Sequence, residues 1–260
     1  MGDGRIPHQA AEGFQAGAED YERARPSYPA EAVAHLVGHT GLGPGRRLLD
    51  LAAGTGKLTR LLVPTGADVV AVEPVAGMRE QLVAVLPDVV ALDGTAEDIP
   101  AEDAAFDVLT AAQAVHWFDL PVALPEMARV LRPGGSLAVV FNVMDETVDW
   151  VRAYHRAIDT GRGLPFRRYV ETDFGDAISE VGGGRFTDLQ RYECRWTLPY
   201  DTEMLVDRAA SVSVVASLEP EEKQGVLDDV RRLAATHPDL AGRPVIGFPY
   251  TTRVLRWTRS

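Results

Sequence analysis

Between residues 47 and 142, short apolar runs alternate with segments of helical periodicity. Five near-continuous apolar runs have the composition of strands that are buried on both faces of a sheet. They span residues 47–51, 68–73, 89–93, 106–111 and 136–142. The segments with helical periodicity span residues 30–37, 57–63, 76–86 and 121–131. Strands that alternate with helices in this order predict a doubly wound α/β fold with five parallel strands.

The regular alternation ends after residue 144. Residues 145–185, which include the run Gly182 to Gly184, predict irregular helical structure that forms a cap insertion. Segments 186–197 and 251–257 alternate apolar and polar residues and predict a C-terminal antiparallel pair that completes a seven-stranded sheet. Two helices are expected between these strands, at residues 202–218 and 219–235. The chain is therefore divided into a core at 41–144, the cap insertion, and C-terminal strands and helices at 186–260.

The charge balance narrows the class of partner. Against 38 Asp and Glu residues there are 26 Lys and Arg residues, which gives a net charge of −12. Since nucleic-acid binding depends on cationic side chains that meet phosphates, no nucleic-acid partner is expected. No apolar run reaches the roughly 18 residues of a membrane-spanning helix, and the first residues lack a signal pattern. We therefore expect a cytoplasmic protein with no membrane partner.

Metal and disulfide chemistry are not expected either. Cys194 is the only cysteine, so one chain can form neither a disulfide framework nor a zinc site of several thiolates. No cluster of histidines and carboxylates has the spacing of metal ligands.

The strongest chemical signal is the sequence LLDLAAGTGKLTR at residues 48–60, where an apolar strand leads into a glycine-rich turn and a helix. Gly54 and Gly56 have no side chains to keep a ligand from the backbone, and they permit the positive φ of a tight turn. Asp50 places a carboxylate beside that turn, where it can accept hydrogen bonds from turn amides or face a ligand ammonium. The turn therefore suits a ligand with a positive amine better than a phosphate.

The second predicted strand ends in an acidic residue, Glu73. A carboxylate near the point where the strand order reverses can accept hydrogen bonds from both hydroxyls of a ribose, which indicates a nucleoside ligand. Met78, one turn into the following helix, can lie against an adenine face or pack in the core. Both interpretations of Met78 stay open.

Two other nucleotide-binding motifs do not match. The dinucleotide fingerprint Gly-x-Gly-x-x-Gly requires a third glycine, which is missing from GTGKLTR. In a P-loop, glycine would replace Leu51 and a hydroxyl residue would follow Lys57, where Leu58 stands. A nicotinamide-dependent oxidoreductase is therefore the weaker alternative.

The order of motifs from Asp50 to Asn142 resembles that of the class I S-adenosylmethionine-dependent methyltransferases, which have a Rossmann-like sheet. Further motifs that carry the resemblance are DGTAEDIP at 93–100, FDVLTAAQAVHWFD at 106–119 and LRPGG at 131–135. Within that family the chain is most similar to small-molecule methyltransferases of the trans-aconitate methyltransferase-like group, also called methyltransferase type 11. This closer likeness rests on YERARPSYP at 21–29, AAQAVHWFD at 111–119 and FPYTTRVLRW at 248–257.

The resemblance implies S-adenosyl-L-methionine as the cofactor. The cofactor-binding residues that it implies are Tyr21, Arg25, Asp50, Ala52, Gly54, Gly56, Glu73, Pro74, Met78, Thr95, Ala96, Glu97 and Gln113. Residues 1–40 are expected to form a lid in which Tyr21 and Arg25 cover the methionine end of the cofactor. The alternative for Arg25 is a pairing with Glu19 or Glu22. Tyr28 and Trp117 are the candidate substrate-binding residues.

The expected function is transfer of a methyl group to a small-molecule acceptor by in-line displacement, in a monomer or a homodimer. His116 is the candidate catalytic residue, because an imidazole with a pKa of about 6.5 suits base work near neutral pH. Alternatively, His116 orients a loop or stacks on Trp117, and a carboxylate acceptor would need no base. A non-catalytic protein that binds S-adenosylmethionine or S-adenosylhomocysteine remains a second alternative.

Overall fold

The computed structural model describes residues 25–159 and 173–260, so the predictions for Tyr21 and for most of the 1–40 segment lie outside the described residues. The described strands form a seven-stranded sheet in the order β3-β2-β1-β4-β5-β7-β6. Their bounds are β1 Arg47–Leu51, β2 Asp68–Val72, β3 Val90–Leu92, β4 Phe106–Ala112, β5 Leu131–Met144, β6 Phe186–Tyr200 and β7 Ile246–Arg259. The strands β1 to β5 pair in parallel, whereas β7 runs antiparallel to both β5 and β6. The predicted fold class is confirmed.

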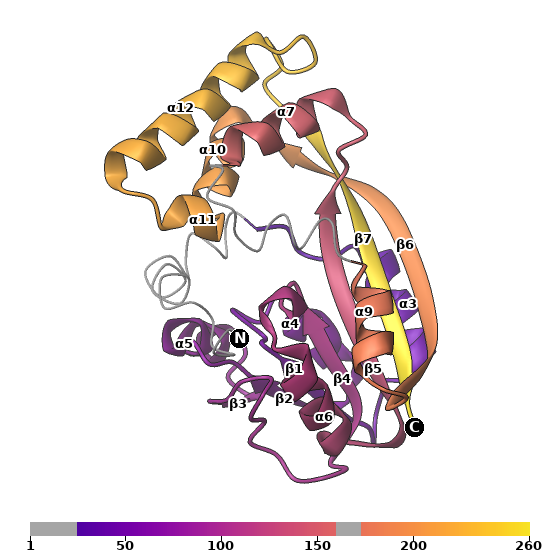
Figure 1. Cartoon of the computed structure of the whole chain (residues 1–260). Helices are drawn as coiled ribbons and strands as arrows, with labels where there is room; N and C mark the ends of the chain where they lie inside the picture. Colours follow the sequence, from indigo (N-terminus) through magenta and orange to yellow (C-terminus); the bar gives the residue numbers. More distant parts are fainter. Residues whose placement is uncertain (1–24, 160–172) are drawn as a thin grey trace.

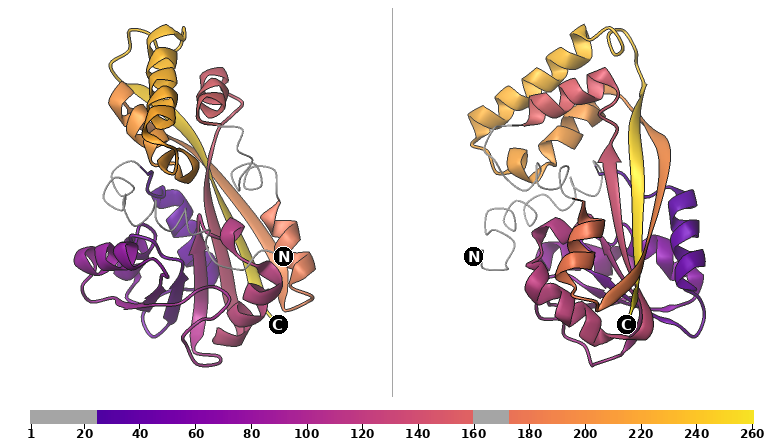
Figure 2. Two further views of the ribbon diagram at one scale, coloured as in Figure 1. Left: turned by 60° about the vertical axis from the view of Figure 1, so that its left-hand side comes forward. Right: turned by 45° about the vertical axis from the view of Figure 1, so that its right-hand side comes forward.

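Helices cover both faces of the sheet, because its central strands are apolar on both sides. On β1, Leu48 belongs to one apolar core and Leu49 and Leu51 to the other. The first core receives α3 Ala30–Thr40, α4 Thr59–Leu62 and α5 Ala76–Val85. The second core receives α6 Leu120–Val130 and α9 Phe174–Val181, and Figure 2 shows α3 and α9 on opposite sides of the long strands.

Three of the strands are longer than their patterns predict. Strand β5 begins at Leu131 rather than at residue 136, because Leu131 pairs with Phe106 before a register shift brings Ser136 opposite Val108. The predicted turn at Pro133 and Gly134 thus lies inside an irregular part of the strand. Together with β6 and β7, β5 extends past the ends of the other strands toward a group of helices (Figure 1).

These helices form a cap with an apolar core of its own. The cap contains α7 Asp149–Ile158, α10 Thr202–Ala210, α11 Ser213–Ala216 and α12 Pro220–Thr236. The ring of Phe248, from β7, lies 5.0 Å from that of Trp150 and 5.4 Å from that of Tyr154. The single helix predicted at 202–218 is thus two helices, because α10 ends at Ala210 and α11 begins at Ser213.

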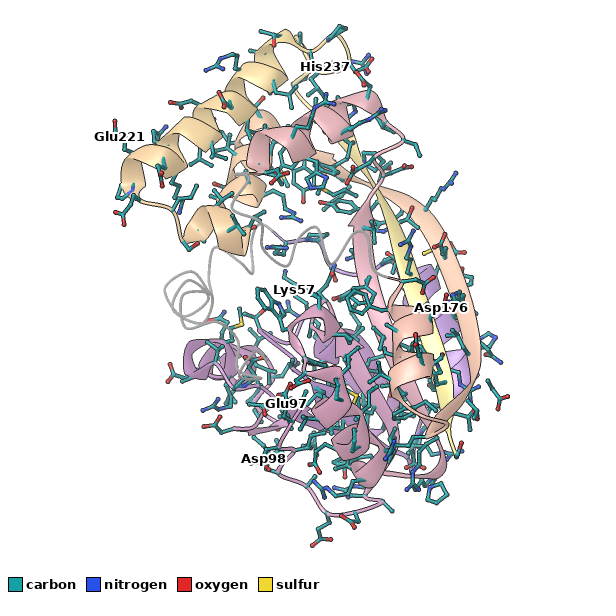
Figure 3. All side chains as sticks on the ribbon, in the orientation of Figure 1. Lys57, Glu97, Asp98, Asp176, Glu221 and His237 are labelled. Atoms are coloured by element: carbon teal, nitrogen blue, oxygen red, sulfur yellow. The ribbon has the colours of Figure 1, made fainter. Side chains whose placement is uncertain are left out.

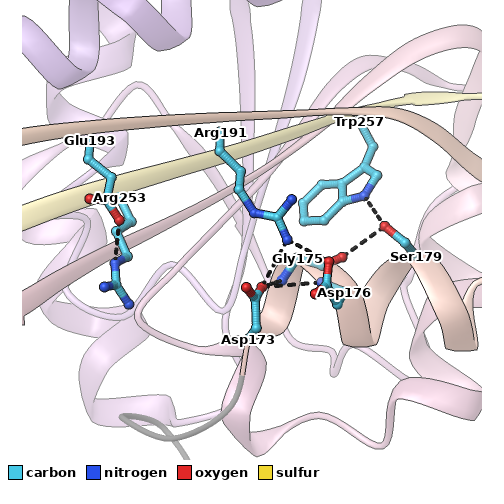
Figure 4. A network of polar contacts seen from close by, with 8 residues as sticks. All are labelled: Asp173, Gly175, Asp176, Ser179, Arg191, Glu193, Arg253 and Trp257. Atoms are coloured by element: carbon cyan, nitrogen blue, oxygen red, sulfur yellow. Dashed lines mark hydrogen bonds and ion pairs between the residues drawn. The ribbon is translucent and has the colours of Figure 1, made fainter.

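The two described parts of the 145–185 segment lie in different places. Helix α7 belongs to the cap, whereas α9 packs against α6 and β6. The carboxylate of Asp173 caps α9 by accepting hydrogen bonds from two backbone amides, and Arg191 of β6 forms ion pairs with Asp173 and Asp176 (Figure 4). Trp257 of β7 donates a hydrogen bond of 3.0 Å to Ser179. These contacts hold α9 on the sheet, and the 145–185 boundary itself stays a prediction.

Candidate functional site

A pocket lies at the carboxyl ends of β1, β4 and β5, on the side that faces the cap. Its empty space amounts to about 570 Å³, including the part that is open to solvent. The residues that line it are Arg25, Pro26, Tyr28, Asp50, Ala52, Ala53, Gly54, Thr55, Lys57, Leu58, Ala112, Gln113, Asn142 and Arg208. Figure 3 labels Lys57 at the edge of the sheet region that faces the cap. The pocket is therefore built from the glycine turn, the strand ends, the segment before α3 and one cap helix.

The turn between β1 and α4 contains three residues with positive φ. Ala52, Gly54 and Gly56 have φ values of 53°, 59° and 82°, in the left-handed region that favours glycine. A Cβ atom at Gly56 would lie 3.1 Å from Leu82 Cγ, so α5 packs closely there. Among the described residues, a Cβ atom at Gly54 would meet only Met78 Sδ within 4 Å, at 3.9 Å. Backbone conformation thus favours glycine at both positions, and Gly54 also leaves room for a ligand.

Asp50 is a buried carboxylate at the end of β1. Its Oδ2 accepts a hydrogen bond of 2.6 Å from the Thr59 hydroxyl, and its Oδ1 accepts one of 2.7 Å from Thr110. Thr110 reaches it because Asp50 and Thr110 are register partners on β1 and β4. Burial raises the pKa of Asp50 to about 6, and the two threonine hydrogen bonds oppose that rise. Asp50 is therefore ionised at pH 7 but titrates near physiological pH.

Glu73 connects the end of β2 to the glycine turn. Its Oε2 accepts a hydrogen bond of 2.9 Å from the amide of Gly54, and its Oε1 accepts one of 2.9 Å from the amide of Val75. Burial raises the pKa of Glu73, while these hydrogen bonds and the positive charge of Arg79 oppose the rise. The carboxylate thus positions the turn through its own hydrogen bonds. A carboxylate oxygen has a second lone pair, so each can also accept a hydroxyl.

The far wall of the pocket is a hydrogen-bonded group at the ends of β4 and β5. Gln113 has a φ of 56°, and its side-chain amide donates to the carbonyl oxygen of Asn142 at 3.0 Å. Asn142 donates from Nδ2 to the carbonyl oxygen of Ser27 at 2.9 Å and accepts at Oδ1 from Thr252 at 2.6 Å. The segment before α3 is therefore fastened to the sheet beside the pocket.

Several predicted cofactor residues lie outside the pocket lining. Ala96 is buried in the core and Met78 lies under Gly54. The hydroxyl of Thr95 accepts a hydrogen bond from the amide of Asp98, and Glu97 accepts one of 2.9 Å from the amide of Asp119, at the start of α6. Of the predicted site residues within the described chain, those that line the pocket are Arg25, Tyr28, Asp50, Ala52, Gly54 and Gln113. Those that do not are Gly56, Glu73, Pro74, Met78, Thr95, Ala96, Glu97, His116 and Trp117.

Comparison with known proteins decides the family. A methyltransferase domain model matches residues 49–139. An uncharacterised methyltransferase of Mycobacterium tuberculosis is 45% identical over 239 residues, which cover 92% of each chain. The chain is a class I S-adenosylmethionine-dependent methyltransferase. The similarity to the type 11 group is confirmed by the domain model.

One further relative and one solved structure extend the comparison beyond one genus and to the fold. An uncharacterised methyltransferase of Schizosaccharomyces pombe is 31% identical over 221 residues, which cover 84% of this chain and 86% of that protein. The solved structure of an Anabaena variabilis protein, provisionally described as a methyltransferase from an antibiotic biosynthesis pathway, superposes with a TM-score of 0.62 at 21% identity. That match covers 89% of this chain and 98% of the other. The second match shows that the fold is shared.

The turn of this methyltransferase fits the cofactor that its family uses. The open space beside Gly54 would be filled by a side chain, and the buried carboxylate of Asp50 suits the ammonium of the methionine part. Over residues 25–159 and 173–260, no group of three or more metal-ligating side chains could hold an ion. Within the same residues, no helix is long and apolar enough to cross a membrane.

His116 of the methyltransferase lies in the 3-10 helix Val115–Trp117, which follows β4. Burial, followed by the positive charge of Arg25, lowers the pKa of His116 to about 3. The imidazole is therefore neutral and weakly basic at pH 7. Its ring centroid lies 5.0 Å from that of Trp117, with the planes inclined by 42°. Its role as a general base stays a prediction, and the ring packing agrees with the alternative of an orienting residue.

Among the residues of this site that the sequence did not predict are Thr59, Thr110, Asn142 and Arg208. Asn142 ends the fifth predicted strand, where polar residues of such sheets meet ligands, so its position was a usable signal. Thr110 could be found only from the register of two strands that are distant in sequence. Arg208 carries a different signal, because it shares one face of α10 with the buried residues Leu205 and Ala209.

Proposed function

We propose that this methyltransferase transfers a methyl group from S-adenosylmethionine to a small-molecule acceptor that binds between the glycine turn and the cap. The observation that carries the proposal is the enclosure of the pocket. Its lining joins Asp50 and Gly54 of the sheet to Arg208 of the cap, so the space over the cofactor turn is roofed by another part of the chain. A roofed pocket suits an acceptor of small size better than the surface of a macromolecule.

We assign the cofactor contacts according to the chemistry of each residue. Asp50 would attract the ammonium, Gly54 and Ala52 would contact the ligand through their backbone, and Glu73 would accept the ribose hydroxyls while it holds the turn. The base would lie near Met78 and the turn that holds Thr95, Ala96 and Glu97. Gly56, Pro74 and Gln113 shape the surrounding backbone, while Tyr21 and Arg25 are assigned to the methionine end.

The cofactor, when bound, supplies an electrophilic methyl group on a sulfonium. The protein's contribution is orientation and the exclusion of water, which together can account for roughly 7 to 11 kcal/mol of barrier reduction. Asn142 and Gln113 fix the wall at the strand ends, and Tyr28 and Trp117 are the proposed acceptor contacts. A neutral His116 fits an orienting role better than proton removal, since burial lowers its pKa to about 3.

The test is a transfer assay with methyl-labelled S-adenosylmethionine. Purified protein is incubated with a cell extract that has been divided by ultrafiltration into a small-molecule fraction and a macromolecular fraction. We expect label in products of the small-molecule fraction, and none with the Gly54→Val variant. Label that enters only protein or nucleic acid would refute a small acceptor, and cofactor binding without any transfer would favour the non-catalytic alternative.

The negative charge of the chain and its lack of a described membrane-spanning helix leave further properties as predictions. We propose a cytoplasmic protein, a monomer or a homodimer, that has no nucleic-acid partner. Gel filtration of the full chain tests the oligomeric state, a nucleic-acid retention assay tests the lack of that partner, and cell fractionation tests the location.

A further inference from the structure

The loop between β3 and β4, residues 93–105, is fastened to both ends of helix α6. It includes the turn at residues 95–97 that we assign to the adenine base, and Figure 3 labels Glu97 and Asp98 within it. At the start of α6, Glu97 accepts a hydrogen bond of 2.9 Å from the amide of Asp119. In the last turn of α6, Arg129 donates hydrogen bonds to the other end of the loop. The loop is therefore attached to the helix at two separate points.

Arg129 uses all the donors of its guanidinium in this attachment. Its Nη1 donates to the carbonyl oxygen of Ala101 at 2.7 Å and to Asp103 at 2.9 Å. Its Nη2 donates to the carbonyl oxygen of Ile99 at 2.9 Å and to Glu126 at 2.7 Å. Its Nε donates to Glu126 at 2.8 Å. A planar guanidinium with five N–H donors matches this set of acceptors, whereas the three donors of a lysine ammonium do not.

Two further groups of α6 complete the attachment. The carboxylate of Glu126, which holds the guanidinium of Arg129, also accepts a hydrogen bond of 3.2 Å from the amide of Ile99. The hydrogen bond from Arg129 lowers the pKa of Glu126 against the effect of burial, so this carboxylate is ionised at pH 7. The carbonyl oxygen of Arg129 accepts a hydrogen bond of 2.8 Å from the amide of Ala104. Because Ala104 has a φ of 51°, this contact holds the loop in a conformation that alanine rarely adopts.

The turn itself is compact. Ala96 and Ile99 are buried in the core of the sheet. A Cβ atom at Gly94 would lie 2.4 Å from Pro100 Cδ, so the two ends of the turn are in close contact. Apolar packing has no directional preference, so it does not by itself fix the position of the turn along α6. The directional contacts that fix this position are the hydrogen bonds at the two ends of the helix.

A turn that reads a base must be placed accurately, because hydrogen bonds weaken steeply when their geometry is distorted. Adenine presents an amino donor at C6 and an acceptor at N1, whereas its deaminated form, hypoxanthine, presents a carbonyl acceptor and an N–H donor there. Binding groups must be held to within about 0.5 Å by the residues that support them. A displaced turn would therefore lose the distinction between the two bases before it loses contact with them.

We propose that Arg129 is a positioning residue that sets the base selectivity of the cofactor site. By holding the loop at Ile99 and Ala101, it keeps the turn at residues 95–97 where that turn can distinguish adenine from other purines. The inference rests on the proposed function. Arg129 acts through the loop, since its donors are engaged with the loop and with Glu126. The glycine turn lies on a different segment, so contacts to the methionine part of the cofactor should not depend on Arg129.

The experiment measures selectivity for the base with the full chain. S-adenosylhomocysteine and S-inosylhomocysteine, which carries hypoxanthine in place of adenine, are titrated separately by calorimetry. We expect the wild-type protein to bind the adenine compound at least about tenfold more tightly. In Arg129→Met this ratio should fall at least about fivefold, while affinity for S-inosylhomocysteine changes by less than about threefold.

The matched control is Arg232→Met. Arg232 pairs with Asp229 at 2.7 Å on α12, with the same i, i+3 spacing as Arg129 and Glu126. Its removal changes the net charge equally and should leave the ratio of affinities as in the wild-type protein. Hydrogen exchange supplies a local readout, because Arg129→Met should speed exchange in residues 93–105 and leave residues 48–60 unchanged.

Two milder variants carry the test if Arg129→Met does not fold. Arg129→Lys keeps the charge but not the five donors, and Glu126→Gln keeps the shape of its side chain but not the charge. Each should lower the ratio of affinities at least about twofold. A ratio that stays at the wild-type value in these folded variants would overturn the proposal.

The remaining outcomes separate the inference from the function on which it rests. An equal loss of affinity for both compounds in Arg129→Met would make Arg129 a residue of general stability and overturn the proposal. A wild-type protein that binds both compounds alike would show that the turn does not read the base, which also overturns it. Failure of the wild-type protein to bind S-adenosylhomocysteine at all would refute the proposed function, and the inference with it.

Discussion

Affinity for the cofactor should depend on pH through one carboxyl group. Burial raises the pKa of Asp50 to about 6 in the protein without ligand, and we assign its ionised form to the ammonium of S-adenosylmethionine. If only the ionised form binds tightly, the dissociation constant rises as Asp50 becomes protonated. Relative to pH 8, affinity should fall about twofold at pH 6 and about tenfold at pH 5.

The same group should affect the stability of the protein without ligand, with a definite sign. The carboxyl of Asp50 has a higher pKa in the folded protein than its ordinary value of 3.8. The folded state therefore binds a proton more readily than the unfolded state, and this contribution to stability is full below about pH 4. It is lost as the pH rises through about 6, and its full size is about 3 kcal/mol for a shift of about two pKa units.

The assay is calorimetric titration of S-adenosylhomocysteine between pH 5 and pH 8, with urea unfolding of the ligand-free protein over the same range. Asp50→Asn is the control, because it keeps the shape of the side chain and removes the titration. It should bind at least tenfold more weakly at pH 8 and show a flatter profile in both measurements. An affinity that does not change from pH 8 to pH 5, or a wild-type pH step that persists in Asp50→Asn, would refute the reasoning.

Three other substitutions test the turn and the histidine. Glu73→Ala should weaken S-adenosylhomocysteine binding at least tenfold, as measured by calorimetry. It should also lower the free energy of unfolding by about 1 to 3 kcal/mol, because two backbone amides lose their acceptor. Unchanged affinity would show that Glu73 is not part of the site. Gly54→Val should abolish binding, since a β-branched residue resists positive φ and fills the open space; a folded variant that binds normally would contradict this. His116→Ala should keep cofactor affinity within a few-fold and lower kcat by less than about a hundredfold. A larger loss that imidazole rescues would establish His116 as a base.

The order of elements could be predicted from the sequence because it depends on local signals. The apolar runs located all five parallel strands, and LLDLAAGTGKLTR located the turn together with Asp50 and Gly54. These features depend on periodicity, on glycine and on a carboxylate within a few positions of one another. They are therefore visible in a single short window.

Features that depend on distant pairing could not be predicted in this way. The hydroxyl of Thr110 is brought to Asp50 only by the register of β1 and β4. The lengths of β6 and β7 follow from their pairing with each other as far as Tyr200 and Ile246, where the alternating pattern has already ended. Arg208 reaches the pocket only because the cap helices fold back over the strand ends. Nothing in its neighbours along the chain points to Asp50.

Each of the long strands β5 and β7 contributes residues to two apolar cores, that of the sheet and that of the cap. On β5, Leu137 and Val139 are buried in the sheet core while Met144 belongs to the cap core, and on β7 the residues from Phe248 to Trp257 connect the same two regions. The cap above the pocket is thus joined to the glycine turn below it by the continuous backbone of β5 and β7, and these strands set the spacing between the two. Substitutions on the pocket side of α10 can change which molecule is admitted without moving the cofactor turn. A change of acceptor in this fold can therefore arise from substitutions in the cap alone, with the cofactor turn retained.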